Sequence, residues 1–333
     1  MPTKIFFLHT GNETFTRLDR DLLRMSYEVD ELFAPKKFPA RIRKYFRGIE
    51  NADLTYCWFA GWNSFWAILI SKILKKPSIL IVGGYDVANL HEANYGHQRG
   101  GLGKLTSKWA MQLSNKILPF SEFSKSEAEK NAKIPSKKMR VVYIGVPDHI
   151  QNISEIKKER VALTVGGVDW SNLKRKGLEP FVRTAELMPD VKFILIGKWS
   201  DASIDYLRSI ATPNVIFTGK VSDQELLEYY KIAEVYVQPS LHEGFGLSVA
   251  EAMLAGCIPV VTRIGSLPEV VGNCGVYCVS NQPKDICNSI QNAFETYSTQ
   301  RQHIRDRILQ EFSLESRAEQ LNEIIQSLMS NKE

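Results

Sequence analysis

The sequence has few cysteines, and they form no motif. Five occur in 333 residues, an odd number with no C-x-x-C pair. A disulfide framework and a cysteine-ligated zinc site both need paired or closely spaced thiols, so this pattern argues against both. We expect reduced, mostly buried thiols at the five positions, which are Cys57, Cys257, Cys274, Cys278 and Cys287.

Long apolar runs are also missing. The longest membrane-like stretch, residues 62–74, is interrupted by Asn63, Ser64, Ser71 and Lys72. It falls short of the roughly 20 residues that a membrane-spanning helix needs. The apolar run near the N-terminus is too short for a signal peptide. We therefore expect a cytoplasmic protein that is at most peripherally attached to the inner face of a membrane.

Positive charge is concentrated in the first half of the chain. Residues 1–150 carry a net charge of +9, whereas residues 151–333 carry −4. The densest basic stretch, residues 36–47, alternates cations with aromatic residues. It fits contact with an anionic membrane and, equally, a solvated helix face. No recognisable nucleic-acid module surrounds it, so we expect no nucleic-acid partner.

The chain is long for one hydrophobic core, so we expect two domains. In the first half, apolar runs alternate with segments of helical periodicity, which predicts a parallel, doubly wound α/β sheet. A polar, charge-mixed stretch at 151–160 then indicates a boundary between domains 1–150 and 151–333. The strands predicted in the first domain cover residues 5–8, 29–33, 54–59, 79–82, 117–119 and 141–144.

The most informative segment covers residues 235–262. It predicts a buried strand, a polar loop with His242 and Glu243, a Gly-Phe-Gly turn, a helix from about Leu247, and a second buried strand. A strand that enters a helix through a glycine-containing loop presents backbone N–H groups and the positive end of a helix dipole. We therefore expect a phosphate group at this turn, whose residues are Gly244, Phe245, Gly246 and Leu247.

Two glutamates, Glu243 and Glu251, flank this turn. A carboxylate next to an anion site is electrostatically unfavourable, so its presence indicates a different ligand group. Carboxylates can accept two hydrogen bonds from a vicinal diol, as in dinucleotide-binding folds. We expect a ribose diol at Glu251 and the transferred sugar near Glu243. The alternative is a helix N-cap acid and an ordinary surface glutamate.

Residues 242–253, HEGFGLSVAEAM, are followed by GCIPVV at 256–261 and SLPEVVG at 266–272. This series resembles the E-x7-E signature of family 4 glycosyltransferases, and the resemblance covers most of the C-terminal half. It implies the GT-B fold, in which two Rossmann-like doubly wound domains face an interdomain cleft and the last helix crosses back onto the N-terminal domain. It also implies transfer of a hexose-type sugar from a UDP-, GDP- or ADP-linked donor to a glycan or lipid-linked acceptor, with retention of anomeric configuration.

The resemblance also assigns roles to single residues. The lysine of the family's Lys-Gly pair contacts the donor pyrophosphate, which corresponds to Lys176 here. The glycine loops at Gly11 and Gly166 and the backbone near Val221 are expected near the donor. Where relatives carry an arginine after the first glycine, this chain has Gly167, and we expect Arg175 or Lys174 to compensate.

Two other positions depart from the family pattern. Relatives supply a histidine after the fourth strand, whereas this chain has Asp86 there, with His91 five residues later. We predict that Asp86 contacts the transferred sugar or the acceptor hydroxyl, and the alternative is a helix N-cap. Ile144 stands where relatives place an asparagine.

No Asp-x-Asp pair occurs in a suitable loop, so we expect neither a metal nor a cofactor. Glu243, Lys176 and Asp86 are the predicted catalytic residues, with Lys176 and the helix dipole stabilising the leaving diphosphate. One rival hypothesis is a phosphate-using enzyme of the same fold. The other is a non-catalytic GT-B protein that binds a sugar nucleotide as a sensor or scaffold, which the three departures favour.

Overall fold

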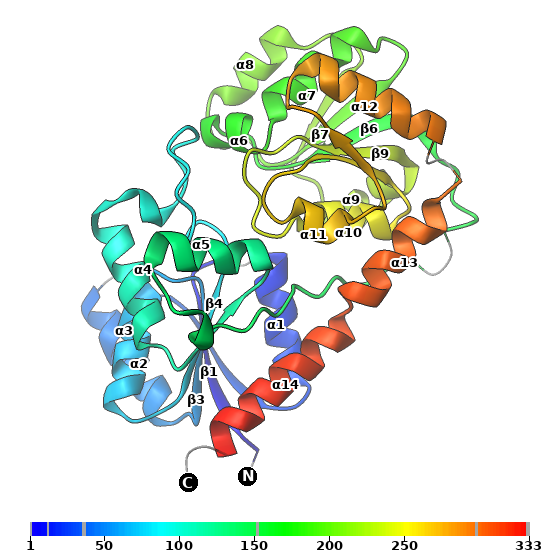
Figure 1. The fold of residues 1–333 in the computed structure, drawn as a ribbon. Helices are drawn as coiled ribbons and strands as arrows, with labels where there is room; N and C mark the ends of the chain where they lie inside the picture. Colours follow the sequence, from blue (N-terminus) through cyan, green and yellow to red (C-terminus); the bar gives the residue numbers. More distant parts are fainter. Residues whose placement is uncertain (1, 12, 35–37, 151–152, 297–298, 331–333) are drawn as a thin grey trace. The chain divides into compact units, whose positions relative to one another are not determined.

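The computed structural model describes residues 2–11, 13–34, 38–150, 153–296 and 299–330, without the side chains of residues 38–40. These residues form two compact units (Figure 1). Unit 1 contains the chain up to His91, Tyr95–Gly145 and the helix α14 (Leu314–Ser330). Unit 2 contains Glu92–Asn94 and Val146–Ser313. The predicted boundary lay between residues 150 and 151, whereas the two units divide between 145 and 146.

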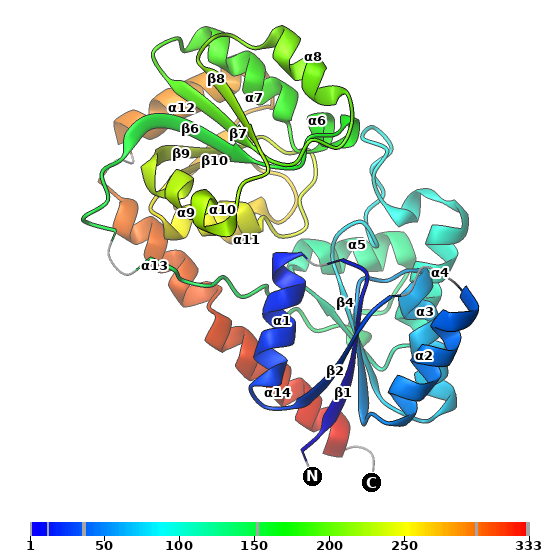
Figure 2. The same cartoon turned by 180° about the vertical axis from the view of Figure 1, so that it is seen from behind.

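Unit 1 is built on a five-stranded parallel sheet with the strand order β2-β1-β3-β4-β5. The helices α2, α3 and α4 cover one face of this sheet, and α1 and α14 pack together on the other (Figures 1 and 2). The strands are β1 (Lys4–His9), β2 (Glu28–Phe33), β3 (Leu54–Trp58), β4 (Ser78–Val82) and β5 (Lys116–Pro119). The helices before α14 are α1 (Thr14–Arg24), α2 (Phe38–Glu50), α3 (Trp62–Ile73), α4 (Gly101–Leu113) and α5 (Glu122–Ala132).

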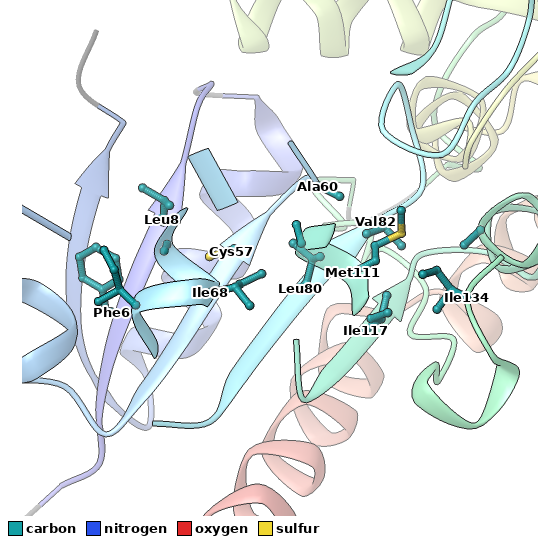
Figure 3. Packing of buried hydrophobic residues seen from close by; sticks show 14 of the residues in the cluster. Phe6, Leu8, Cys57, Ala60, Ile68, Leu80, Val82, Met111, Ile117 and Ile134 are labelled. Carbon is teal, nitrogen blue, oxygen red and sulfur yellow. The ribbon is translucent and has the colours of Figure 1, made fainter. Parts of the chain in front are cut away.

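The core of unit 1 lies between the sheet and helices α2 to α4. Every residue of β3 and β4 is buried, as expected for central parallel strands covered on both faces. Alternate residues of a strand share a face, so Phe6 and Leu8 of β1 enter the same core (Figure 3). Other members shown there are Cys57, Leu80, Val82, Ile117, and the helical residues Ile68 and Met111.

A buried ion pair ties α14 into unit 1. The Arg317 guanidinium donates to both carboxylate oxygens of Asp19 on α1, at 2.5 and 2.8 Å. It also donates to the carbonyls of Val142 and Tyr143, and Tyr56 donates its hydroxyl to Asp19. Both charged side chains are almost completely buried. Removing either partner would leave an uncompensated buried charge, so α14 is an integral part of this unit.

Unit 2 is built on a six-stranded parallel sheet with the order β11-β10-β9-β6-β7-β8. Its strands are β6 (Glu159–Val165), β7 (Lys192–Ile196), β8 (Val215–Gly219), β9 (Ala233–Gln238), β10 (Ile258–Thr262) and β11 (Val276–Cys278). Its helices are α6 (Trp170–Arg175), α7 (Leu178–Thr184), α8 (Ser203–Ile210), α9 (Asp223–Ile232), α10 (Leu247–Leu254), α11 (Leu267–Val271), α12 (Pro283–Thr296) and α13 (Arg301–Glu311). Short 3-10 turns cover His97–Arg99, Ser136–Lys138 and Ala185–Leu187.

One predicted strand was wrong. Residues 141–144 run beside β5, where Val142 N bonds to Pro119 O, but they form no continuous ladder. Two of their carbonyls, on Val142 and Tyr143, instead accept hydrogen bonds from Arg317, which competes with strand pairing. The three-residue strand β11 was not predicted, because it is too short to show a period.

Two expectations about the side chains and helices are confirmed. All five cysteines are free and buried. Among the helices in the described part of the chain, none has the length and apolar content to cross a membrane.

Candidate functional site

The turn between β9 and α10 is the centre of the candidate site. Gly246 takes the left-handed conformation with φ of 90°, and α10 begins at Leu247. The N–H groups of a helix's first turn lack intrahelical partners and carry partial positive charge. The Phe245 ring is buried and packs edge-on against Phe312, with centroids 5.5 Å apart. Phe245 therefore offers a ligand its backbone rather than its ring.

Glu243 precedes this turn and faces a cation. Its Oε2 atom lies 3.6 Å from the Lys176 Nζ and accepts a hydrogen bond of 2.6 Å from the Gln238 side-chain amide. Burial alone would raise the pKa of the Glu243 carboxyl, but Lys176 and Arg175 together hold that pKa below its ordinary value. Glu243 is therefore ionised at neutral pH.

The backbone of Glu243 is fixed by the loop after β10. Its carbonyl accepts hydrogen bonds from the Ser266 N–H at 3.0 Å and from the Ser266 hydroxyl at 3.1 Å. Gly265, with φ of 65°, approaches so closely that a Cβ there would lie 2.4 Å from the Glu243 carbonyl oxygen. Only glycine fits this approach, and the main chain of Glu243 is held independently of its carboxylate.

Lys176 follows helix α6 and reaches the site along a glycine. A Cβ on Gly166 would lie 2.9 Å from the Lys176 Cδ, so the missing side chain at Gly166 makes room for the lysine stem. Burial lowers the pKa of Lys176, and the nearby Glu243 opposes that shift. A bound anion would stabilise the charged amine further.

Arg175 holds the site loop rather than extending from it. Its guanidinium is buried and donates to the Asn172 side-chain oxygen at 2.7 and 3.1 Å and to the His242 carbonyl at 3.3 Å. The Arg175 carbonyl accepts from the Leu241 N–H at 2.8 Å. Arg175 is thus a buried cation that holds residues 241–242, and its compensation for Gly167 stays a prediction.

Glu251 lies on α10, one helix turn beyond the residues that open it. Its Oε2 atom accepts a hydrogen bond of 3.0 Å from the Tyr230 hydroxyl. Burial raises the pKa of the Glu251 carboxyl to about 7. Val221, predicted near the base of the donor, lies partly buried in the loop between β8 and α9.

Two side chains that contact the predicted glutamates, Gln238 and Tyr230, were not predicted from the sequence. Gln238 and Tyr236 are alternate residues at the end of β9, so they share a face of the sheet. The Tyr236 hydroxyl links Ser248 of α10, at 2.8 Å, to the Gln238 side-chain oxygen, at 3.2 Å. Polar residues at every second position of a buried strand were the available signal.

Two other predicted site residues, Gly11 and Asp86, belong to unit 1. The Asp86 carboxylate is buried and accepts hydrogen bonds from three backbone amides: Ala60 at 2.9 Å, Gly83 at 3.2 Å and Gly84 at 2.9 Å. Burial raises the pKa of Asp86 to about 6. The chain turns here instead of starting a helix, so Asp86 connects the loops after β3 and β4 and is not the alternative helix N-cap.

Gly11 follows β1, and its carbonyl oxygen lies 2.5 Å from the Nδ1 of His9. The other ring nitrogen of His9 lies 3.1 Å from a carboxylate oxygen of Glu31 on β2. The loop that carries Gly11 is thus attached to the sheet through a histidine. His91, five residues beyond Asp86, is exposed.

The basic stretch at 36–47 is described in part. Lys36 and Lys37 lie outside the described residues, as do the side chains of residues 38–40. On the rest of α2, Tyr45 and Ile49 are buried, whereas Arg43, Lys44, Phe46 and Arg47 are exposed. The cations therefore line the outer side of this helix.

Comparisons with known proteins find matches that include the part of the chain around this site. Residues 159–296, which include Lys176, Glu243 and Glu251, match the family model described as "Glycosyl transferases group 1". The serotype-specific mannosyltransferase WbdA of Escherichia coli is 34% identical over 109 residues, covering 29% of this chain and 13% of WbdA. The uncharacterized glycosyltransferase MJ1607 of Methanocaldococcus jannaschii is 28% identical over 262 residues, covering 62% of this chain and 65% of the relative. The chain thus spans less than two thirds of the length of these relatives.

Solved structures match along almost the whole chain. Anabaena Alr3699/HepE, in complex with UDP and glucose, has a TM-score of 0.74 at 16% identity, with 98% of this chain and 100% of that chain covered. Sucrose-phosphate synthase from Thermosynechococcus elongatus has a TM-score of 0.77 at 16% identity, with 99% and 100% covered. The predicted GT-B fold of two doubly wound α/β domains is confirmed. These structures show the fold, and the similarity to group 1 glycosyltransferases rests on the sequence match at residues 159–296.

Proposed function

We propose that this protein transfers a hexose-type sugar from a nucleotide diphosphate sugar to a glycan or lipid-linked acceptor, with retention of anomeric configuration. The observation that carries the proposal is the cluster of Lys176 and ionised Glu243 beside the turn that opens α10. Support comes from the mannosyltransferase relative and from the structural neighbours in complex with UDP or UDP-glucose.

In this proposal the donor binds across the β9–α10 turn. The diphosphate contacts the amides that open α10 and the Lys176 amine, which already faces one carboxylate. The Glu251 carboxylate accepts hydrogen bonds from the ribose hydroxyls, and the backbone near Val221 contacts the base. Gly166 and Arg175 act indirectly, because they position Lys176 and the loop that carries Glu243.

The proposed reaction breaks the bond between the anomeric carbon and the diphosphate oxygen. Negative charge grows on the leaving diphosphate, where Lys176 and the helix amides stabilise it by preorganised electrostatics. Positive charge grows on the sugar ring, where Glu243 stabilises it. The acceptor oxygen forms the new bond to the anomeric carbon, and its proton passes to the leaving diphosphate oxygen. Because lysine and helix dipole balance the diphosphate, we propose that no metal is needed, and activity should survive EDTA.

Asp86 contributes from unit 1 by shaping the Gly83–Gly84 loop, which we propose lines the acceptor or sugar site together with the Gly11 loop. Its hydrogen bonds to Gly83 and Gly84 fix that loop after the buried strand β4. We also propose peripheral contact of the exposed α2 cations, within residues 36–47, with an anionic membrane.

The test combines binding and turnover. Calorimetry with UDP-, GDP- and ADP-linked sugars identifies the donor, and hydrolysis or transfer is then compared for wild type, Glu243→Gln and Lys176→Ala. Lys231→Ala is the matched control, because Lys231 is partly exposed and pairs with Glu228 on α9. We expect both site variants to lose activity while the control keeps it. Wild-type turnover in both site variants would contradict the assignment.

A non-catalytic sugar-nucleotide-binding role is the second candidate. The observation that favours it is Asp86, which stands where relatives carry a histidine and whose oxygens are occupied by backbone amides. Tight binding of one nucleotide sugar without hydrolysis or transfer to any glycan or lipid-linked acceptor would support this second candidate over the first.

A further inference from the structure

Helix α3 has apolar residues on its solvent side. Its buried inner side carries Ile68 and Ile70 beside small and polar residues such as Ser71, which donates its hydroxyl to Thr55 of β3 at 2.7 Å. Its outer side carries Trp62 and Ile73, both exposed, and Phe65, Trp66 and Leu69 are partly exposed, with Phe65 and Trp66 also packed against the core. Surface helices of globular proteins normally place apolar residues inward and polar residues outward. The outer side of α3 therefore lacks the polar cover of an ordinary surface helix.

Helix α4 continues the same apolar surface. Leu102, Leu105 and Trp109 recur at helical spacing along one side and are 60%, 47% and 43% exposed. Neighbouring α3 packs against α4, and the ring centroids of Phe65 and Trp109 are 5.6 Å apart (Figure 1). The two apolar stripes therefore join into one surface, the α3–α4 face. Its members are Trp62, Phe65, Trp66, Leu69, Ile73, Leu102, Leu105 and Trp109.

Lysines border the α3–α4 face without any acidic residue. Lys72 and Lys75 lie at the end of α3, and Lys104 and Lys108 lie on α4, and all four are at least partly exposed. Neither helix contains an aspartate or glutamate, and the sequence has none between residues 93 and 121. Helix α2, which packs against α3, adds exposed cations on the same layer. On α3 and α4 the rim of the apolar surface thus carries a single charge sign, whereas α2 also ends in the exposed Glu50.

We propose that the α3–α4 face binds the surface of an anionic lipid bilayer. The tryptophans lie at headgroup depth, the leucines and Ile73 enter the acyl boundary, and the lysines meet lipid phosphates. A protein partner fits less well, because lysine is depleted at protein interfaces whereas exposed Trp, Leu and Lys together are typical of interfacial membrane helices. The surface also accounts for the apolar run at 62–74, which is too short to span a membrane.

The full-length protein is tested by sedimentation with two kinds of vesicle: phosphatidylcholine alone, and an equal mixture of phosphatidylcholine and phosphatidylglycerol. We expect binding to the mixed vesicles and much weaker binding to phosphatidylcholine. The double variant Leu105→Ser/Trp109→Ser should reduce binding at least about tenfold, since two side chains that would be buried in lipid are removed. Lys104→Glu/Lys108→Glu should weaken binding to mixed vesicles by about fivefold per lysine and leave phosphatidylcholine unaffected.

Unit 2 supplies a matched control. Leu187→Ser/Trp170→Ser removes the same two residue types at similar exposures, 49% and 53%. This control should bind mixed vesicles as the wild type does. Equal loss in the control, or no binding of the wild type to mixed vesicles, overturns the proposal. If Leu105→Ser/Trp109→Ser proves unfolded by circular dichroism, the lysine variant decides the question in its place.

Light scattering without vesicles tests whether a second copy of this chain, instead of lipid, covers the α3–α4 face. If the wild type is a dimer that the Leu105→Ser/Trp109→Ser variant converts to a monomer, and neither binds vesicles, the α3–α4 face joins two copies of this chain and the lipid proposal fails. Neither measurement uses a sugar nucleotide. The outcome is therefore independent of whether the proposed transferase activity is correct.

Discussion

Two carboxylates follow buried parallel strands in this molecule, and their surroundings differ. Asp86, after β4 in unit 1, accepts hydrogen bonds from three backbone amides. Glu243, after β9 in unit 2, accepts one from the Gln238 side-chain amide, faces the Lys176 amine and has a single backbone donor acting on its pKa, the N–H of Gly244. The main chain of Glu243 is held separately by Ser266. An acid at the end of a strand can thus stabilise its own loop or remain available to a ligand, and its partners distinguish the two cases.

The two environments shift the pKa values in opposite directions. Burial raises the pKa of Asp86 to about 6, although backbone donors oppose that shift. Burial also acts on Glu243, but the neighbouring cations Lys176 and Arg175 outweigh it and lower the pKa. Loss of Asp86 should therefore affect mainly folding, and loss of Glu243 mainly the reaction.

The largest expected effect is on catalysis by Glu243→Gln. This change keeps the shape of the side chain and removes the charge that we propose stabilises the sugar ring. We expect kcat/KM to fall by about 100- to 1000-fold, the range seen when one preorganised electrostatic group is lost. Initial rates with the identified donor and acceptor measure it. The assignment of the reaction to Glu243 would be wrong if kcat/KM fell less in Glu243→Gln than in Asp86→Asn, after correction for the fraction of each variant that is folded.

The next effect is on stability. Asp86→Ala leaves two buried N–H groups and one partly buried N–H group without an acceptor, and each fully buried one costs about 1–3 kcal/mol. We expect the free energy of unfolding in urea to fall by roughly 3 kcal/mol or more. Asp205→Ala serves as the control, because Asp205 is an exposed acid on α8 and its loss should change stability by less than about 0.5 kcal/mol. Equal effects of the two substitutions would contradict the loop-holding role.

The pH dependence of unfolding sharpens the same contrast. The folded state keeps the Asp86 proton up to about pH 6, whereas the ordinary pKa is 3.8. The pH-dependent part of the contribution of Asp86 to stability is therefore fully present below pH 3.8 and is lost as the pH rises through 6, whereas the hydrogen bonds to the three amides persist. Glu243 behaves oppositely: its contribution is present at neutral pH and is lost on acidification.

Urea unfolding from about pH 2 to about pH 7 tests this sign, because the Glu243 contribution is lost only below the ordinary carboxyl pKa of 4.5. In the wild type, the Asp86 term lowers the free energy of unfolding as the pH rises, and Asp86→Asn should abolish this decrease. Glu243→Gln should reduce the fall in the free energy of unfolding on acidification. Parallel changes in the two variants would show that the environments of the two acids are alike.

The smallest effect concerns donor affinity at Glu251. Its pKa of about 7 means that the carboxylate, the form that accepts ribose hydrogen bonds, becomes dominant only above that pH. We expect affinity for the nucleotide sugar to rise severalfold between about pH 6 and 8, and Glu251→Gln to abolish the rise. Calorimetry should use the intact nucleotide sugar, because its diphosphate does not titrate in this range. An unchanged pH profile in the variant would place the ribose elsewhere.

Local patterns predicted much of this structure. The buried strands of both sheets are continuous apolar runs, and the β9–α10 turn has the glycine that its left-handed backbone requires. The hydrogen-bond partners of the site residues were harder to predict from the sequence. Tyr230 of α9 reaches Glu251 of α10 from 21 residues away, which a local pattern does not show, whereas Gln238 lies only five residues before Glu243. Contacts between distant parts of the chain also explain why the strand predicted at 141–144 is absent. Arg317, which is distant in sequence, donates hydrogen bonds to the carbonyls of Val142 and Tyr143.

The Arg317–Asp19 pair also sets the order in which the chain can mature on the ribosome. Domains generally fold as they emerge, the N-terminal one first. Here the first-made domain keeps a buried aspartate without its counter-ion until residue 317 has been synthesised, after all the strands of the later domain. The half translated last can therefore complete its sheet before the half translated first is finished.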